Sequence, residues 1–293
     1  MKLGLGTAQF GLAYGISGPG ARVSLSEVKA ILELARKRGV SMLDTAPAYG
    51  DSETVLGECL AGRGGFEIVT KTIAAGGDRI TDEDAARVDA AFAASLAHLR
   101  TKSVDAVLAH RADDLLAPGG DKIYGLLARW RAEGRTRKIG VSVYTREQID
   151  ALFERHAYDI VQLPVSVFDQ RLVADGTLDF LKRAGVEIHA RSVLLQGLAI
   201  MEPSSIPRGL LPARPLVEQF RHTLSQWGLS PLAGALRYVA GLAAIDRVVV
   251  GVHSVAQLEE CLGAMEASAA QHDYSAFACA NEAIIDPRQW SAA

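Results

Sequence analysis

Four polar side chains at the ends of short apolar runs could together move a proton. Asp44 and Tyr49 lie in the stretch LDTAPAYGDSE, Lys71 ends FEIVTK, and His110 follows VDAVLA. A phenol has a pKa near ~10, too high for an efficient acid at neutral pH, but a neighbouring ammonium favours the phenolate. A buried ammonium needs a counter-charge, which Asp44 would supply. The set predicts a proton-delivery site aimed at one oxygen, which His110 could hydrogen-bond.

Proton delivery to one oxygen suits the reduction of a carbonyl group. No side chain donates hydride, so a nicotinamide cofactor would have to supply it. Each residue taken alone also has a purely structural interpretation, such as a turn cap for Asp44 or a half-buried imidazole for His110. The chemical interpretation therefore requires that the fold bring all four residues to one place.

Eight short apolar runs alternate with amphipathic segments along the chain. The expected strands cover residues 3–7, 40–44, 66–70, 104–109, 138–142, 159–163, 186–191 and 246–250. The expected helices cover residues 24–39, 53–61, 81–99, 121–133, 146–155, 175–184, 215–227, 230–240 and 254–266. This alternation predicts a (β/α)8 TIM barrel that forms a single domain over residues 1–293, with its chemistry at the carboxyl ends of the strands. A doubly wound sheet is the alternative, but GLGTAQFG (4–11) lacks its glycine pattern.

Two segments carry capping-box spacing, in which the first residue and the fourth bond each other's backbone N–H groups. Ser24 with Glu27 predicts the start of one helix, and Ser254 with Gln257 predicts the start of another. The stretch 199–215 contains four prolines and is the longest segment expected to be irregular. Loops of that length are usually functional or mobile, and a surface decoration without a function is the alternative.

Composition excludes several other classes of protein. The formal net charge is −3, so no global field favours nucleic acid or an anionic membrane. Three widely separated cysteines, Cys59, Cys261 and Cys279, suggest neither a disulfide framework nor a zinc site. The N-terminal stretch MKLGLGTAQFG does not fit a signal peptide, and no apolar run approaches the ~20 residues that span a bilayer. These features predict a cytoplasmic protein.

At these residues the chain resembles the aldo-keto reductase family. LDTAPAYGDSE is similar to the family's D-T-A-x-x-Y-G-x-S-E signature, VTKT to its lysine strand and LAHRADD to its histidine strand. Four later segments are similar to the family's cofactor-binding segments and occur in the same order: GVSVY (140–144), VQLPVSVFDQ (161–170), RSVLLQGL (191–198) and GVHSVAQLEECLGA (251–264). The resemblance implies a TIM barrel that reduces a small-molecule aldehyde or ketone with NADPH or NADH.

By matching position, the resemblance also implies a role for each site residue. Tyr49 would be the general acid, Lys71 and Asp44 would tune it, and His110 would orient the carbonyl. The implied cofactor-binding residues are Ser142, Gln162, Arg191, Ser192, Leu195, Gln196, Gly197, Gly251, His253, Ser254, Gln257 and Glu260. In that set, Ser142 and Gln162 would hold the nicotinamide carboxamide, with Arg191 stacked nearby. Residues 192–198 would follow the pyrophosphate, and the last four residues would meet the adenosine end.

The sequence departs from the family in several places, among them Val143 and Cys261, where the family often has Asn, and Arg191, where it often has an aromatic residue. His253 stands where the family often has Arg or Lys, a cation that pairs with the 2′-phosphate of NADP. Because a neutral imidazole is a weaker partner for that phosphate, the substitution favours NADH as the cofactor. The N-terminal hairpin that commonly closes the barrel bottom is not expected, so other residues must cover that end. The substrate pocket is expected to involve Phe10, Tyr14, Phe168 and Trp290.

Two other functions fit parts of the pattern. The first is a non-catalytic NAD(P)-binding module that reports redox state to a protein partner; the altered cofactor segments favour it, and the intact set of four polar residues opposes it. The second is a metal-dependent barrel hydrolase using Asp44, His110, His189 and His253. The sequence lacks an HxH pair or clustered carboxylates at ligand spacing, so no metal site is expected.

Overall fold

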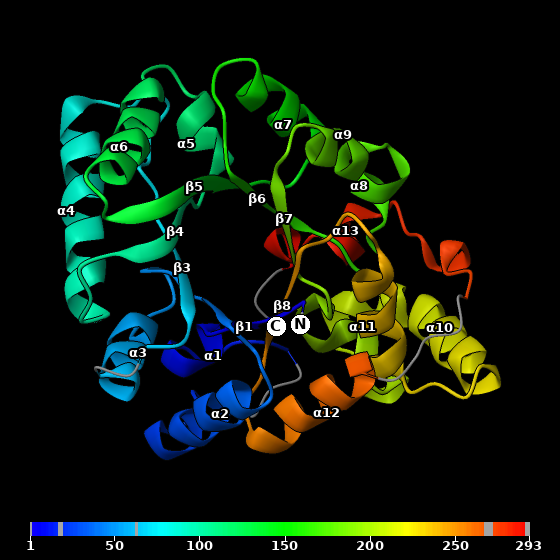
Figure 1. Cartoon of the computed structure of the whole chain (residues 1–293). Coiled ribbons are helices and arrows are strands. Elements are labelled where there is room, and N and C mark those ends of the chain that lie inside the picture. The colour runs from blue at the N-terminus through cyan, green and yellow to red at the C-terminus, as the bar shows by residue number, and fades with distance from the viewer. Residues whose placement is uncertain (1, 17–19, 62–63, 267–271, 291–293) are drawn as a thin grey trace.

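Eight parallel strands close into one ring at the centre of the molecule (Figure 1). The computed structural model describes residues 2–16, 20–61, 64–266 and 272–290. The strands are β1 (Leu3–Gly6), β2 (Met42–Asp44), β3 (Glu67–Lys71), β4 (Val104–Ala109), β5 (Thr136–Ser142), β6 (Ile160–Pro164), β7 (Glu187–Arg191) and β8 (Arg247–Gly251). They pair in chain order, and β1 pairs with β8 to complete the ring. The predicted TIM barrel is confirmed.

Helices surround the ring and follow the strands as predicted. The predicted helices are α2 (Leu25–Lys37), α3 (Ser52–Leu60), α4 (Asp82–His98), α6 (Asp121–Ala132), α7 (Arg146–Phe153), α9 (Thr177–Arg183), α10 (Arg214–Gln226), α11 (Pro231–Gly241) and α12 (Val255–Glu266). Short helices that were not predicted are α1 (Ala8–Gly11), α5 (Ala112–Leu116), α8 (Arg171–Ala174) and α13 (Glu282–Ile285). The described part of the chain also contains five 3-10 segments: η1 (Leu195–Ile200), η2 (Pro203–Ser205), η3 (Arg208–Ala213), η4 (Ser275–Phe277) and η5 (Pro287–Gln289).

The proline-rich stretch 199–215 is therefore more regular than the sequence suggested. It contains η2 and η3, and its residues Met201, Ile206 and Leu210 are buried. Proline fixes its own φ but donates no backbone N–H, which suits short 3-10 turns better than a long helix. Together with η1 and α10, the stretch packs around a second hydrophobic cluster that lies beside the barrel.

The core divides into an outer and an inner layer because strand side chains alternate in direction. Leu5, Leu43 and Val107 point outward and pack with the helices in the main hydrophobic core. Met42, Val69, Ala106, Leu108 and Ile160 form a separate small cluster inside the ring. Since alternate residues share a face, the inner layer supports the side chains that follow it at the carboxyl ends of the strands.

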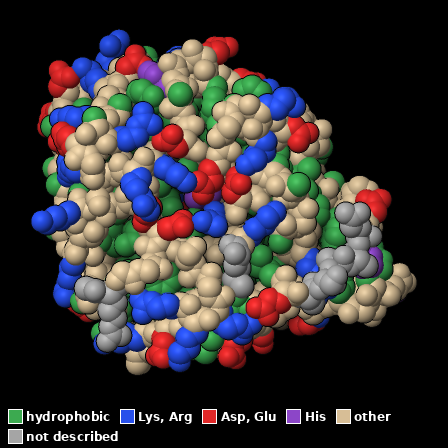
Figure 2. All heavy atoms as spheres, in the orientation of Figure 1, with side chains coloured by type: hydrophobic (Ala, Val, Ile, Leu, Met, Phe, Trp, Pro, Cys, Tyr) green, Lys and Arg blue, Asp and Glu red, His purple; other side chains and the backbone are tan. Residues whose placement is uncertain are grey.

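Charged side chains fill the opposite end of the barrel. Glu67 and Arg247 begin β3 and β8 and pair at 3.1 Å. Glu187, which begins β7, binds Lys138 and lies 2.9 Å from His189 Nε2. Lysine, arginine, aspartate and glutamate side chains intermix over the middle of the face shown in Figure 2. Among the described residues, these ion pairs lie across the starts of the strands and cover this end of the barrel.

The two predicted capping boxes form only in part. Ser24 Oγ accepts from Glu27 N at 3.3 Å, as expected. The Glu27 carboxylate, however, accepts from Val255 N at 2.8 Å and so caps α12 instead of its own helix. At α12 itself, Ser254 Oγ accepts from Gln257 N, while Gln257 Oε1 accepts from His253 N at 2.7 Å. The caps thus join elements that are distant in sequence.

Candidate active site

Asp44 and Lys71 form a buried ion pair at the carboxyl ends of β2 and β3. Lys71 Nζ donates to Asp44 Oδ1 at 2.6 Å and to the carbonyl oxygen of Thr45 at 3.0 Å. Gln162, on β6, donates from Nε2 to the other Asp44 oxygen at 2.7 Å. Lys71 is only 1% exposed. Every charged atom of the pair therefore has a close polar partner in place of water, which a buried ion pair requires.

Tyr49 and His110 complete the group that the sequence predicted. Lys71 Nζ lies 5.0 Å from the centroid of the Tyr49 ring. The rings of Tyr49 and His110 meet edge to face, with centroids 6.0 Å apart. Gly11 allows the Tyr49 loop to approach α1, since a Cβ at Gly11 would lie 1.9 Å from the Tyr49 carbonyl oxygen. The structure thus brings all four residues together.

The protonation states of Lys71 and His110 follow from this packing. Burial opposes the charge on Lys71, but Asp44 and Tyr49 favour the ammonium more strongly, so the pKa of Lys71 is raised. Burial and the nearby Lys71 charge lower the pKa of His110 to about 4. At neutral pH the lysine is therefore charged and the imidazole is neutral. A neutral imidazole carries one N–H, which can be donated to a substrate oxygen.

A groove with a volume of about 410 Å³ runs from this cluster across the ends of β6, β7, β8 and β1. It contains Asp44, Tyr49 and His110, with Lys71 buried beneath them. The predicted cofactor residues that line it are Ser142, Gln162, Arg191, Ser192, Gln196, Gly197, Gly251, His253, Gln257 and Glu260. Tyr14, expected in the substrate pocket, also lines it. Ten of the twelve residues implied for the cofactor thus share one surface.

The other two cofactor residues have different positions. Leu195 is fully buried in the second hydrophobic cluster, so its side chain faces away from the groove. Its backbone nevertheless belongs to an unusual turn, in which Ser192, Leu195 and Gln196 have φ values of 56°, 46° and 53°. Ser254 does not line the groove, and its hydroxyl caps α12. Leu195 and Ser254 could therefore contact a ligand through their backbone atoms but not through their side chains.

The loop after α1 crosses the groove. His253 Nε2 lies 3.1 Å from the Tyr14 carbonyl oxygen, a distance that suits donation by the imidazole. Two residues later, Ile16 N donates to the Gln196 carbonyl at 3.1 Å. This loop therefore joins the ends of β7 and β8 and fixes the orientation of the His253 ring.

Three residues expected to line the substrate pocket lie elsewhere. Phe10 is fully buried in the main core because the short helix α1 turns its side chain inward. Phe168 is also fully buried, with its ring 5.4 Å from Phe220 in the second cluster. Trp290 packs against that same cluster. None of the three is among the residues that line the groove or the neighbouring cavity beyond His110.

This second cavity, of about 450 Å³, lies on the other side of His110. It is lined by residues from the ends of β2 to β5 and by Arg288, from the C-terminal segment. Tyr144 and Arg288 line both the groove and this cavity. In the sequence, Tyr144 is notable only as the last residue of GVSVY, a segment similar to the family's, and Arg288 belongs to no such segment. The segment IIDPRQW has no strand or helix periodicity, so nothing in it indicates that it returns to the barrel mouth.

The residues considered for a metal site do not come together. In the described part of the chain, no group of three or more His, Cys, Asp or Glu side chains is placed to hold a metal ion. His189 belongs to the charged layer at the opposite end of the barrel, where it binds Glu187. Likewise, no described helix has both the length and the apolarity needed to cross a membrane.

Known proteins share both the sequence pattern and the fold of this chain. A sequence model of the Aldo/keto reductase family matches residues 2–282. Aldo-keto reductase YhdN of Bacillus subtilis (strain 168) is 27% identical over 179 residues, or 58% of this chain. The match spans 52% of that protein, about half the relative's length.

Two solved structures illustrate the shared fold. The holo form of aldo-keto reductase AKR11C1 from Bacillus halodurans matches with a TM-score of 0.74 and 21% identity over 92% of this chain and 88% of that one. The glycerol dehydrogenase AKR11B4 from Gluconobacter oxydans matches with a TM-score of 0.70 and 20% identity, covering 92% of this chain and 88% of that chain.

Proposed function

Because the chain belongs to the aldo/keto reductase family, we propose that it reduces an aldehyde or ketone to an alcohol with NADPH or NADH. The observation that carries the proposal is the buried Lys71–Asp44 pair beneath Tyr49, with a neutral His110 beside the phenol. A side chain that delivers a proton and one that donates a hydrogen bond thereby converge on a single oxygen position.

The residues divide the chemistry among themselves. Tyr49 gives its hydroxyl proton to the carbonyl oxygen as that oxygen gains charge. The Lys71 ammonium stabilises the phenolate left behind, and Asp44 holds Lys71 in place. His110 donates its N–H to the same oxygen and so sets the direction of the carbonyl. A bound reduced nicotinamide would supply the hydride.

The groove fits such a cofactor. Gly251 leaves room that a side chain would take, since a Cβ there would lie 2.3 Å from Gln9. Ser142 and Gln162 line the end nearest Tyr49, where a carboxamide would need polar partners. The left-handed turn at Ser192 and Gln196 exposes backbone along the middle, and the start of α12 lies near His253.

The catalytic proposal is tested by replacing the phenol. Tyr49→Phe should lower kcat for an activated aldehyde at least ~100-fold, as expected for loss of a general acid, with cofactor affinity nearly unchanged. The matched control is Tyr124→Phe, on the outer helix α6, which should leave kcat unchanged. Equal turnover by wild type and Tyr49→Phe would remove Tyr49 from the mechanism. No turnover by the wild type with any activated aldehyde would instead favour the non-catalytic nucleotide-binding module.

For the cofactor, we expect NADH to compete well with NADPH. His253 stands at the adenosine end, and its imidazole is already bonded to the Tyr14 carbonyl. Among the described residues, two arginines line the groove, Arg191 and Arg288, and both contact Tyr144 at the catalytic end. Neither is therefore placed to pair with a 2′-phosphate at the adenosine end. Steady-state kcat/KM with each cofactor measures the preference. A preference for NADPH above ~100-fold, worth about 2.7 kcal/mol, would contradict this expectation.

A further inference from the structure

Four residues line both the groove and the second cavity: His110, Ser142, Tyr144 and Arg288. A carbonyl held by His110 would therefore lie at the junction of the two spaces. The groove leads from there toward the adenosine end, and the second cavity lies on the other side. The remainder of a substrate would occupy the second cavity, so the charges of that cavity determine which substrates fit.

Tyr144 lies between two guanidinium groups. The Cζ atom of Arg191 is 4.0 Å from the Tyr144 ring centroid, and that of Arg288 is 3.4 Å from it. Two groups this close must occupy opposite faces of the ring, because they would overlap on one face. Arg191 donates to oxygens of Ser142, Val143 and Ser192, all of which are uncharged. Among the described residues, no carboxylate oxygen lies within 4 Å of an Arg191 nitrogen.

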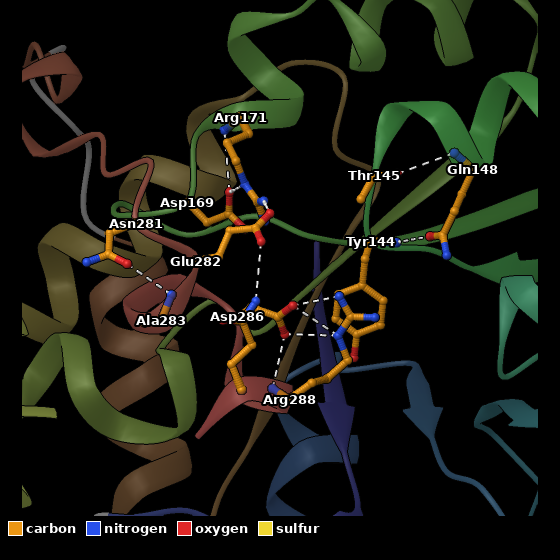
Figure 3. Close-up of polar contacts among 11 residues, drawn as sticks. Tyr144, Thr145, Gln148, Asp169, Arg171, Asn281, Glu282, Ala283, Asp286 and Arg288 are labelled. Carbon is orange, nitrogen blue, oxygen red and sulfur yellow. Dashed lines mark hydrogen bonds and ion pairs between the residues drawn. The ribbon is translucent and has the colours of Figure 1, made fainter. Parts of the chain in front are cut away.

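Arg288 is held rigidly from behind. Its Nη2 donates to Asp286 Oδ2 at 2.6 Å, and its Nε donates to both Asp286 oxygens at 3.0 Å (Figure 3). Asp286 is 4% exposed, whereas the Arg288 side chain is half exposed. The same segment is anchored through Glu282, which accepts from Arg171 at 2.9 Å. None of these bonds uses Nη1 of Arg288, which makes no hydrogen bond to the described residues.

The second cavity carries an excess of positive charge. Its charged lining residues are Arg111, Asp113 and Arg288. Asp113 already accepts from Gln148 at 2.9 Å, and Arg111 is 3.9 Å from Asp114. The three lining charges sum to +1, and Asp286, outside the cavity, offsets that charge. The cation left to match a singly charged anion is Arg191, which lines the adjoining groove and bonds only uncharged oxygens among the described residues. A flat guanidinium edge is well suited to a carboxylate.

We propose that Arg288, supported by Arg191 across Tyr144, binds a carboxylate on the carbonyl substrate, so that the preferred substrates are aldehydes or ketones that carry an acid group. The proposal rests on the proposed reductase activity and specifies its substrate class. Arg288 would act as a specificity residue, because it touches the substrate away from the reacting carbon.

A matched pair of aldehydes tests the proposal: 4-carboxybenzaldehyde and its uncharged methyl ester. Arg288→Gln should lower kcat/KM for the acid about 10- to 100-fold, mainly through KM, while the ester changes less than about threefold. Arg183→Gln, an exposed arginine at the end of α9, is the charge-matched control and should leave both values unchanged. Because Arg288→Gln strands a buried carboxylate, the double variant Asp286→Asn/Arg288→Gln is measured beside it and should show the same selective loss.

The proposal is overturned if both aldehydes lose activity equally in these variants or if neither does. Failure of the reductase proposal would be seen separately, as wild type reducing neither aldehyde. In that event, calorimetric binding of 4-(hydroxymethyl)benzoate decides: wild type should bind it at least about tenfold more tightly than Arg288→Gln. Equal affinities would reject Arg288 as an anion site.

Discussion

Lys71 holds a charge that is almost completely removed from water. Isolated burial of an ammonium would cost several kcal/mol, yet the pKa of Lys71 is raised because Asp44 and Tyr49 outweigh burial. The two Asp44 oxygens are occupied by Lys71 and Gln162, so the carboxylate cannot rotate away. The ammonium is therefore fixed beneath the phenol rather than free to find solvent.

This geometry makes a specific prediction for Lys71. Lys71→Met should lower kcat at least ~100-fold, because the phenolate loses the ammonium that stabilises it. Cofactor affinity should stay within about threefold, because Lys71 lies beneath the groove and does not line it. Steady-state kinetics and a fluorescence titration with NADH measure the two quantities. A large loss of affinity instead would make Lys71 a binding residue.

The single substitution also leaves Asp44 buried without its partner, which can cost about 3–5 kcal/mol of stability. The double variant Lys71→Met/Asp44→Asn removes that unpaired charge and is the matched control. It should recover most of the lost free energy of unfolding but none of the lost turnover. Recovery of turnover together with stability would show that the single variant had merely unfolded.

The sequence predicted this residue cluster because each member follows an apolar strand and the strand ends meet in a parallel barrel. Asp44, Lys71 and His110 could be placed in that way from residue types and spacing alone. Tyr144 and Arg288 gain their importance only from contact with each other, although they are far apart in the chain. Local sequence patterns contain no signal for such a contact. The aromatic residues that were predicted to line the substrate pocket, Phe10 and Phe168, are instead buried in the hydrophobic core.

At the scale of elements, α2 and α12 are joined by a side chain that the sequence assigned to a local cap. Glu27 bonds the first N–H of α12 rather than the start of α2. A capping motif fixes only the residue types at a helix start, and a long carboxylate can reach a neighbouring helix instead. The boundaries of α2 and α12 were predictable, but the partner of Glu27 depended on how those helices pack.

Removing this contact should destabilise the barrel measurably. Glu27→Ala is expected to lower the free energy of unfolding by about 1 kcal/mol, the usual cost of losing a helix cap. Glu259→Ala, an exposed residue on α12 itself, should cost less than about 0.5 kcal/mol. Urea unfolding followed by circular dichroism measures both. If the two variants lose the same free energy, the bond from Glu27 to Val255 contributes nothing.

At the scale of the whole molecule, the two ends of the barrel use charge differently. The carboxyl end of the ring places a few charges beside open space, where a ligand can meet them. The opposite end closes on itself through Glu67 with Arg247 and through Glu187 with Lys138 and His189. Strands and helices could be read from periodicity, but this ionic layer could not, because its members are single residues near the starts of four strands.

The ionic layer should make the stability of the whole barrel sensitive to acid. Hydrogen bonds from His189 and Lys138 lower the pKa of Glu187 to about 2, against an ordinary value of 4.5. A carboxyl with a depressed folded-state pKa contributes stability above its unfolded pKa and loses it as the pH falls through the folded value. Glu187→Gln should therefore cost about 2 kcal/mol at pH 7 and about 1 kcal/mol at pH 3.5.

Urea unfolding of both proteins at the two pH values measures this difference. Glu154→Gln, at the exposed end of α7, is the matched control and should change the free energy of unfolding by less than about 0.5 kcal/mol at either pH. A cost for Glu187→Gln that is the same at pH 7 and pH 3.5 would mean that packing, and not the charge of Glu187, closes this end of the barrel. A cost that shrinks with acid would assign the closure to the ion pairs themselves.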